Sequence, residues 1–288
     1  MERPKLWVPG GKVPQRQVSE QLALVRLAKE VFGVDLGLTD IMLALREYTA
    51  TKGKRGAGRE PVALGMPMIG PVSAAFFIGW CRMRQAPQDY MIPVIDTTLL
   101  SAARNKVVET FLGSHYNWLL FLDSDVVPPA DGIDRLMAHG KKVISGLYHQ
   151  KGGEFLPNMY TYKEWLPEKG QHDYNWITEW PRDETIEVDG VGAGFLLIHR
   201  EVLEAIGKKD WFHFREGGED LAFCRQAKEK GYSIWVDTSV HCGHVSYMVV
   251  GTDHYYARQL GVKNQVEIKE AINKVADGEK EPKGICAI

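Results

Sequence analysis

Two aspartates separated by one residue form a possible cation site. Asp123 and Asp125 follow the apolar run WLLFL and precede Pro128 and Pro129. Two carboxylates in this pattern can hold a divalent cation, which then neutralises a diphosphate. Ligands of open α/β sheets bind at the carboxyl ends of strands, which is where this pair would lie. The alternative is structural, because the same carboxylates could simply cap the turn into the prolines.

A second acidic pair, Glu219 and Asp220, comes after two glycines and before the helical pattern LAFCRQAKEKG. One of these carboxylates could act as a general base that takes a proton from an attacking hydroxyl. An acid at the start of a helix also stabilises the helix without any catalytic role, because it interacts favourably with the helix dipole. Both interpretations are open at the level of sequence.

Two histidines, His241 and His244, lie just after the apolar run YSIWVDTSV. A neutral imidazole there could complete a metal site begun by the two aspartates. The alternative for each is an ordinary hydrogen-bonded histidine of the core or surface.

Three glycines alternate in GVGAG, at positions 190, 192 and 194. They precede an apolar run, whereas the glycines of a dinucleotide-binding fingerprint follow a strand, so that interpretation is rejected. We expect them instead to let the backbone approach a ligand closely.

The elements that must position these residues alternate between short apolar strands and helices from about residue 61 onwards. This alternation is typical of an α/β sheet. A strand leading into a helix is expected at 191–207. Further strands are expected at 62–70, 90–96, 117–129, 141–148 and 232–240, and helices at 71–85, 98–114, 131–140 and 221–231.

The two ends of the chain differ from this pattern. Apolar residues at helical spacing predict helices at 15–32 and 38–48, and a basic, glycine-rich loop follows at 52–60. One more helix is expected at 265–276. The sequence therefore suggests a helical N-terminal extension, a main domain and a C-terminal helix and tail, at 1–60, 61–261 and 262–288 respectively.

Composition limits the class of protein. With 288 residues, 44% of them hydrophobic, the chain can bury a sizeable core. A net charge of −2 argues against a general nucleic-acid coat. No apolar run is long enough for a membrane span, the N-terminus lacks the apolar part of a secretory signal, and the four cysteines include no CxxC pair. We expect a reduced, cytoplasmic protein.

In this order, the features resemble those of the A-type-fold glycosyltransferases, close to the large family-2-like group that uses nucleotide-sugar donors. The matching segments are FLDSD, DGVGAG, GGED and HCGHV, and SAARN is similar to a donor-side helix of such enzymes. The resemblance covers about residues 62–250. It implies a Rossmann-like nucleotide-diphospho-sugar transferase fold with a mixed central sheet, extended here by N-terminal helices.

The resemblance also implies which residues bind the donor. Asp123 and Asp125 would hold Mn²⁺ or Mg²⁺ and, with Ser124, the diphosphate of a UDP- or GDP-sugar. His244 would be a further metal ligand, with His241 as the fallback. The remaining donor contacts would come from Arg104, Asn105, Gly192 and Gly194.

By the same resemblance, Asp220 would be the base that activates an acceptor hydroxyl, and Glu219 would orient the acceptor. A base in this role implies an inverting, single-displacement reaction, although some retaining relatives share the same motifs. The acceptor itself is open between a glycan, a small molecule and modified DNA.

The segment 149–187 interrupts the alternation of strands and helices, and it is rich in aromatic residues. A loop of this length in a compact domain is usually functional. Its aromatic faces could stack on sugar rings or bases, and the loop could order over the donor. The alternative is a surface excursion with a small core of its own. The aromatic residues concerned are Tyr160, Tyr162, Trp165, Tyr174, Trp176 and Trp180.

Three other functions compete with a glycosyltransferase of unspecified acceptor. The helical extension and the basic loop could dock nucleic acid, as in a phage-type DNA glycosyltransferase. A non-catalytic module could use the same scaffold to bind a nucleotide or carbohydrate. A nucleotidyltransferase shares the cation chemistry, but GMPMIGPVS is a poor match to the glycine- and lysine-rich loop expected after its first strand.

Overall fold

The structure is a computed structural model that describes residues 58–68, 72–86, 88–95, 99–152, 154–207, 210–215, 217–246, 249–252 and 255. The helices expected at 15–32, 38–48 and 265–276, and most of the basic loop at 52–60, lie outside the described residues. The N-terminal extension and the C-terminal tail therefore stay predictions.

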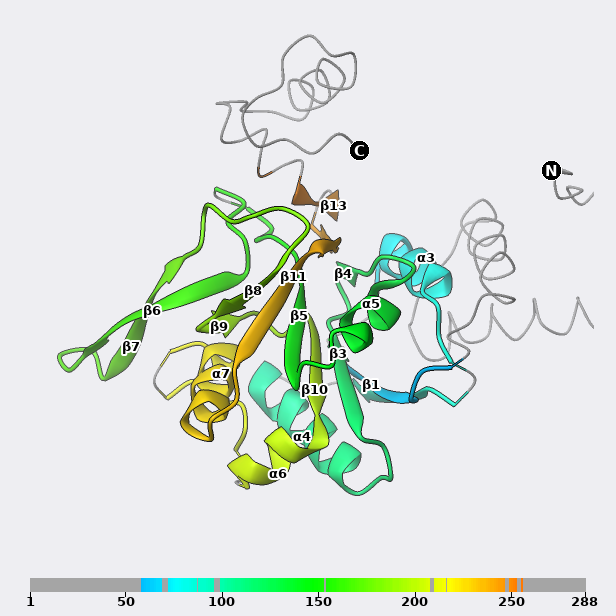
Figure 1. The fold of residues 1–288 in the computed structure, drawn as a ribbon, viewed down its shortest axis with the longest axis horizontal. Coiled ribbons are helices and arrows are strands. Elements are labelled where there is room, and N and C mark those ends of the chain that lie inside the picture. Colours follow the sequence, from blue (N-terminus) through cyan, green and yellow to red (C-terminus); the bar gives the residue numbers. More distant parts are fainter. Residues whose placement is uncertain are drawn as a thin grey trace, which may run out of the picture.

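A seven-stranded sheet in the order β2-β1-β3-β10-β5-β11-β8 forms the centre of the described structure (Figure 1). Strand β10 runs antiparallel to both of its neighbours, β8 runs antiparallel to β11, and the other adjacent pairs are parallel. The mixed sheet expected from the resemblance is thus confirmed. The strands are β1 (Val62–Met68), β2 (Tyr90–Ile95), β3 (Trp118–Leu122), β5 (Val143–Leu147), β8 (Thr185–Val188), β10 (Phe195–His199) and β11 (Ile234–His241).

Helices cover both faces of this sheet, which explains why its central strands consist mainly of apolar residues. Every residue of β1, β3 and β5 is buried. Helices α3 (Ala74–Arg82) and α5 (Gly132–Ala138) pack on one face. The other face is covered by α4 (Leu100–Leu112), α6 (Arg200–Ile206) and α7 (Glu219–Glu229). The strands and helices expected between 62 and 148 and between 191 and 240 are therefore confirmed, with shifts at their ends. The largest shift is in the strand expected at 117–129, which ends at Leu122, while Val126–Val127 form a separate short strand.

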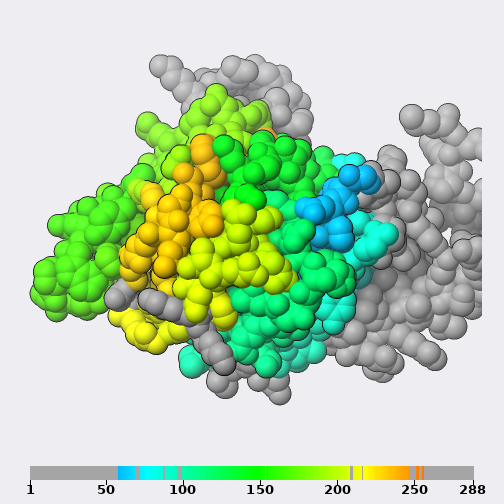
Figure 2. All heavy atoms as spheres, turned by 60° about the horizontal axis from the view of Figure 1, so that its bottom comes forward, coloured from blue at the N-terminus to red at the C-terminus, as the bar shows by residue number. Residues whose placement is uncertain are grey.

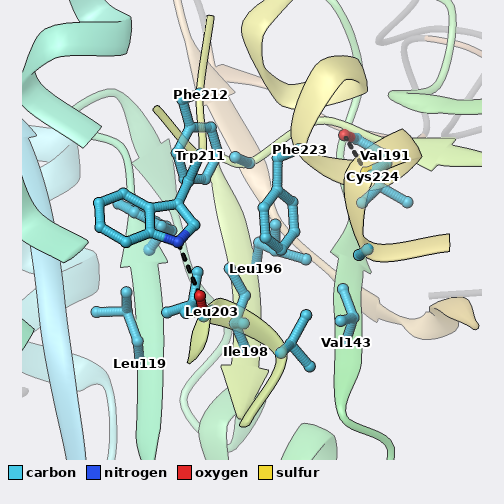
Figure 3. Close-up of a cluster of buried hydrophobic side chains, with 14 of the residues drawn as sticks. Leu119, Val143, Val191, Leu196, Ile198, Leu203, Trp211, Phe212, Phe223 and Cys224 are labelled. Carbon is cyan, nitrogen blue, oxygen red and sulfur yellow. Dashed lines mark hydrogen bonds between the residues drawn. The ribbon is translucent and has the colours of Figure 1, made fainter. Parts of the chain in front are cut away.

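Aromatic side chains build the core between α6, α7 and the sheet (Figure 3). The rings of Phe212 and Phe223 stack with centroids 5.0 Å apart, and Phe121 of β3 meets Phe212 edge-on at 5.2 Å. The Nε1–H of Trp211 donates to the carbonyl of Leu203 at 2.9 Å, so its buried polar group is satisfied. These contacts fasten the segment before α7 to the sheet.

The expectation of a long loop over 149–187 is wrong for much of its length. Strands β6 (Met159–Leu166) and β7 (Gln171–Trp176) form a hairpin, and β9 (Gly190–Val191) pairs with β6 in a second, three-stranded sheet. Gly170 supplies the left-handed backbone that the hairpin turn requires, with φ of 61°. The hairpin points away from the central sheet (Figure 1).

A third small sheet joins β4 (Val126–Val127) to β12 (Gly243–Val245) and β13 (Val249–Val250). It brings the segment after β11 beside the segment after β3. Within the described ranges, no helix combines the length and apolar character needed to cross a membrane. The described cysteines Cys81, Cys224 and Cys242 are buried free thiols.

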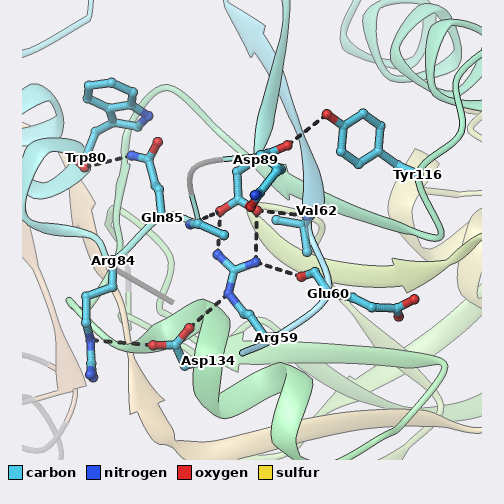
Figure 4. A network of polar contacts seen from close by, with 11 residues as sticks. Arg59, Glu60, Val62, Trp80, Arg84, Gln85, Asp89, Tyr116 and Asp134 are labelled. Carbon is cyan, nitrogen blue, oxygen red and sulfur yellow. Dashed lines mark hydrogen bonds and ion pairs between the residues drawn. The ribbon is translucent and has the colours of Figure 1, made fainter. Parts of the chain in front are cut away.

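A buried ion pair ties the start of β1 to the loop before β2 (Figure 4). Nη1 of Arg59 donates to Oδ1 of Asp89 at 2.9 Å, and Nε of the same guanidinium donates to Asp134 at 2.9 Å. The Asp89 carboxylate, with a side chain only 1% exposed, also accepts hydrogen bonds from the backbone amides of Val62 and Ala86. It therefore has protein partners on both oxygens.

Replacing Asp89 with Ala is expected to lower the free energy of unfolding by about 3–5 kcal/mol, because it removes one of the two carboxylates paired with the buried Arg59 and leaves two amides without their acceptor. Urea unfolding followed by circular dichroism measures this. Glu109→Ala, which removes an exposed i,i+3 pair with Lys106, serves as the control and should cost less than about 1 kcal/mol. Equal losses in the two variants would contradict the interpretation.

Candidate active site

One edge of the central sheet collects the polar residues singled out in the sequence. The parallel strands β3, β5 and β11 end there, and the antiparallel β10 begins there. The backbone amide of Asp123, directly after β3, donates to the carbonyl of Gly194, directly before β10, at 3.0 Å. This is the edge near β4 and β13 in Figure 1. Asp123 and Asp125 therefore lie at the carboxyl end of a central strand, as the sequence predicts.

Arg104 is a buried cation that holds two acidic segments together. Its side chain, 2% exposed, contacts Asp123 through Nη2 at 3.0 Å and Glu219 through Nε at 3.4 Å. Its Nη1 donates to the carbonyl of Ala193 at 3.2 Å. The carboxylates of Asp123 and Glu219 raise the pKa of the guanidinium, although its burial acts in the opposite direction. Arg104 thereby joins α4, the end of β3 and the start of α7.

Arg104 and Asn105, which the sequence assigns to the donor, both bind other parts of the protein in this structure. The guanidinium of Arg104 is occupied by protein partners, and the Asn105 amide clamps the backbone of Phe212. Nδ2 of Asn105 donates to the carbonyl of Phe212 at 2.8 Å, and Oδ1 accepts from its amide at 3.0 Å. Both residues therefore connect segments of the protein around the site. A direct contact of either residue with a donor stays a prediction.

Asp125 has two cationic or potentially cationic neighbours. Nε2 of His244 lies 3.5 Å from Oδ1 of Asp125, and the amine of Lys151 contacts the other oxygen. Burial opposes ionisation of Asp125, but hydrogen bonds from His244 and Lys151 outweigh it and lower the pKa of the carboxyl. His241 instead contacts Thr252 Oγ1 through Nδ1 at 2.9 Å. The structure thus brings His244, the first choice from sequence, to the aspartates.

The donor set at this edge fits partial coordination of a hard cation. Asp125 and His244 offer an oxygen and a nitrogen side by side, and the buried Oδ1 of Asp123 receives no hydrogen bond from the described residues. A complete cluster of three His, Cys, Asp or Glu ligands is not present among those residues. Mg²⁺ and similar ions often use one or two protein ligands and take the rest from phosphate oxygens and water. Such a site would be completed only with the donor.

The structure gives a different reason for the glycines at 192 and 194. A side chain at Gly192 would start 2.1 Å from Oη of Tyr148, and one at Gly194 would start 2.9 Å from Cζ of the same ring. The amide of Gly194 donates to Oη of Tyr148 at 2.9 Å. The glycines therefore make room for Tyr148, whose ring meets His244 edge-on at 5.5 Å. Contact between these glycines and a ligand stays a prediction.

Asp220 lies in the first turn of α7, next to the buried Glu219. Loss of solvent and the negative charge of Glu219 raise the pKa of Asp220 to about 7, although Arg104 and the amide of Leu221 act against the shift. A carboxyl with a pKa near neutrality is suited to proton transfer, because it is partly ionised and can also bind the proton it accepts. Glu219 itself contacts Arg104, so orienting an acceptor directly stays a prediction for it.

Two residues of this edge were missed at the level of sequence. Tyr148 and Lys151 both follow β5; Tyr148 reaches the segment before β10, and Lys151 reaches the segment after β3. Their position after an apolar strand is the signal that could have found them, because parallel strands carry their carboxyl ends to one edge.

This mixed sheet, with a parallel core, an antiparallel β10 and an aspartate pair after its central strand, has the architecture of the A-type glycosyltransferase fold. The structure is similar to that of GalNAc-T7 crystallised with UDP, GalNAc and Mn²⁺, with a TM-score of 0.50 and 12% identity. That likeness covers 89% of this chain and 60% of GalNAc-T7, so the chain spans less than two thirds of that protein.

A197 from STIV is also similar, with a TM-score of 0.48 and 23% identity over 65% of this chain and 86% of A197. Neither a protein-family model nor a curated protein matches the sequence. The fold expected from the sequence is confirmed by the likeness to GalNAc-T7.

Replacing Asp220 with Asn should make the protein more stable at pH 8, by roughly 1–2 kcal/mol for this partly exposed group. The raised pKa means that the folded state favours protonated Asp220, so the wild type loses stability as pH rises towards about 7. The variant has no carboxyl at this position and so does not lose that stability. The difference in the free energy of unfolding between variant and wild type should therefore shrink towards pH 4. Urea unfolding across this pH range measures it, and a difference independent of pH would contradict it.

Replacing Arg104 with Met should cost about 3–5 kcal/mol at pH 8, because Asp123 and Glu219 are left near each other without their cation. The loss should be smaller at pH 5, where protons can bind the freed carboxylates. Urea unfolding at both pH values tests this, with the exposed Lys106→Ala as control. An equal loss at both pH values would mean that packing, and not charge, sets the cost.

Proposed function

We propose that the protein is a metal-dependent glycosyltransferase that moves a sugar from a nucleotide-sugar donor to an acceptor hydroxyl. The observation that carries this proposal is geometric: the buried Arg104 contacts both Asp123, one of the candidate cation ligands, and Glu219, the neighbour of the candidate base Asp220. The pKa shifts of two carboxyls support it. Asp220 has its pKa raised to about 7, while Asp125 is kept ionised by His244 and Lys151. Pairs of carboxyls with diverging pKa values indicate a division of chemical roles.

In the proposed reaction, Asp220 accepts the proton of the acceptor hydroxyl as its oxygen attacks the anomeric carbon of the donor sugar. The bond from that carbon to the diphosphate breaks, and the nucleoside diphosphate leaves. This single displacement inverts the configuration of the sugar. Arg104 and Glu219 act as positioning residues, because they hold α7 against the end of β3.

Asp123, Asp125 and His244 are the residues that would hold a divalent cation. Bound there, it would neutralise the charge that develops on the diphosphate leaving group. The mixed oxygen and nitrogen donors suit Mn²⁺ as well as Mg²⁺. The crystal of GalNAc-T7 holds UDP and Mn²⁺, which makes this pair the first to try.

The test is release of nucleotide from a panel of UDP- and GDP-sugars, with Mn²⁺ or Mg²⁺ and with or without a chelator. Asp220→Asn should lower turnover about 10²–10⁴-fold while leaving UDP binding within a few-fold, because it removes a base and no donor ligand. Asp125→Asn should weaken metal-dependent UDP binding itself. For wild type, turnover should fall as pH drops below about 7, where Asp220 becomes protonated.

Glu109→Gln, an exposed carboxyl change on α4, is the matched control and should leave both readouts unchanged. Binding of UDP that survives with no turnover from any donor would favour the non-catalytic module. Tight, strongly salt-dependent binding of DNA by the full chain would favour the DNA-modifying alternative. Turnover that ignores the chelator would overturn the metal dependence.

A further inference from the structure

The β6–β7 hairpin carries six aromatic side chains on one face. Cross-strand pairing joins the members of three pairs, and a β-bulge between Tyr162 and Glu164 shifts the alternation by one residue. Because of that bulge, Trp165 falls on the same face as Tyr162 instead of the opposite one. The pairs, from the base of the hairpin outwards, are Tyr160 with Trp176, Tyr162 with Tyr174, and Trp165 with His172.

The six rings form a continuous ladder along this face. The ring centroids of Tyr160 and Trp176 are 5.9 Å apart, and those of Tyr162 and Tyr174 are 5.5 Å apart. The outermost pair, Trp165 and His172, is the closest at 4.6 Å. With a rise of about 3.3 Å per residue, three pairs cover roughly 13 Å. We call this surface the aromatic ladder.

The aromatic ladder remains accessible although it is apolar. Tyr162, Trp165 and Trp176 are each more than 40% exposed, at 44%, 42% and 42%. In Figure 2 the hairpin, drawn in green, stands out from the rest of the described surface. Exposed aromatic side chains gathered on one surface are characteristic of binding sites.

The inner end of the aromatic ladder meets the catalytic end of α7. A side chain at Gly190 would contact Leu221, Tyr174 and Tyr160, so these three side chains lie close together around Gly190. Leu221 directly follows Asp220, whose charge contributes to the raised pKa of Tyr160, after the larger effect of burial. A molecule lying on the ladder would therefore have its inner end beside the first turn of α7, which contains Asp220.

The net charge of the hairpin limits which class of molecule can bind to the aromatic ladder. The segment 159–176 contains two lysines and three acidic residues, so its net charge is −1. The charged residues are Lys163, Lys169, Glu164, Glu168 and Asp173. Lys163 is moreover paired with Asp173 at 2.8 Å and with Glu164 at 3.3 Å. Surfaces that bind single-stranded nucleic acid combine aromatic rings with a positive groove. This hairpin has the rings without the positive charge.

We propose that the aromatic ladder binds a neutral oligosaccharide chain and delivers its terminal hydroxyl to Asp220. The faces of aromatic rings are electron-rich, and the C–H groups of a sugar ring carry partial positive charge, so the two stack favourably without ions. This inference rests on the proposed function for the identity of the reaction. It adds that the acceptor is a glycan of several sugar units, held along the hairpin.

The first measurement is binding of the full chain, without donor, to an array of neutral oligosaccharides of one to eight sugar units. Affinity should rise with chain length over the first few units. For a glycan that binds, Tyr162→Ala and Trp165→Ala should each weaken binding at least tenfold, and Trp165→Phe should largely restore it. Thr161→Ala, an exposed change on the opposite face of β6, is the matched control and should have no effect.

UDP binding and donor hydrolysis, measured on the same variants, should stay as in wild type. Active donor hydrolysis together with failure of every glycan on the array to bind, or glycan binding that is unchanged in both ladder variants, overturns the inference alone. Glycan binding with no turnover of any donor overturns the proposed function and leaves the ladder as a glycan site. Binding of a 20-nucleotide oligo-dT in place of glycans, or a dimer that Trp165→Ala separates in ultracentrifugation, also overturns it.

Discussion

One buried positive charge organises the acidic residues of the site. Arg104 is separated by 19 residues from Asp123 and by 115 from Glu219, yet contacts both. Without this cation the negative charges of Asp123 and of the buried Glu219 would be left uncompensated, which is costly away from water. Asp220 lies beside this cluster as an additional acid, and burial together with the neighbouring Glu219 raises its pKa. The same acidic cluster therefore holds α7 against the end of β3 and contains one carboxyl whose pKa is raised.

The sheet and the position of the aspartate pair could be predicted because local sequence determines them. Strands such as β3 are buried on both faces and so appear as uninterrupted apolar runs, and the polar residues that follow necessarily lie at the sheet edge. The contacts of Arg104 and Asn105 could not be predicted, because the residues that these two side chains contact are distant from them in sequence. The glycines at 192 and 194 were assigned to a ligand, whereas Tyr148, more than 40 residues away, occupies the space beside them.

The hairpin was missed for a different reason. Its strands alternate aromatic with polar residues, but the extra residue at the bulge breaks the period of two after Tyr162. Without a covering layer, β6 also lacks the apolar run that marks the strands of the central sheet. Composition did indicate that this segment was unusual, since an ordinary solvated loop contains few aromatic residues. The sequence could identify the residues but not the common face on which they lie.

The hairpin is attached to the remainder of the domain mainly through β9 and the first turn of α7. Its outer pairs contact neither β3 nor the buried arginine. Adding or removing two residues from each strand would therefore lengthen or shorten the row of rings by one step, in the same register, with the sheet unchanged. The length of the row of rings and the acidic cluster around Arg104 therefore depend on separate parts of the chain, so the hairpin can change in length without a change at Asp123 or Glu219.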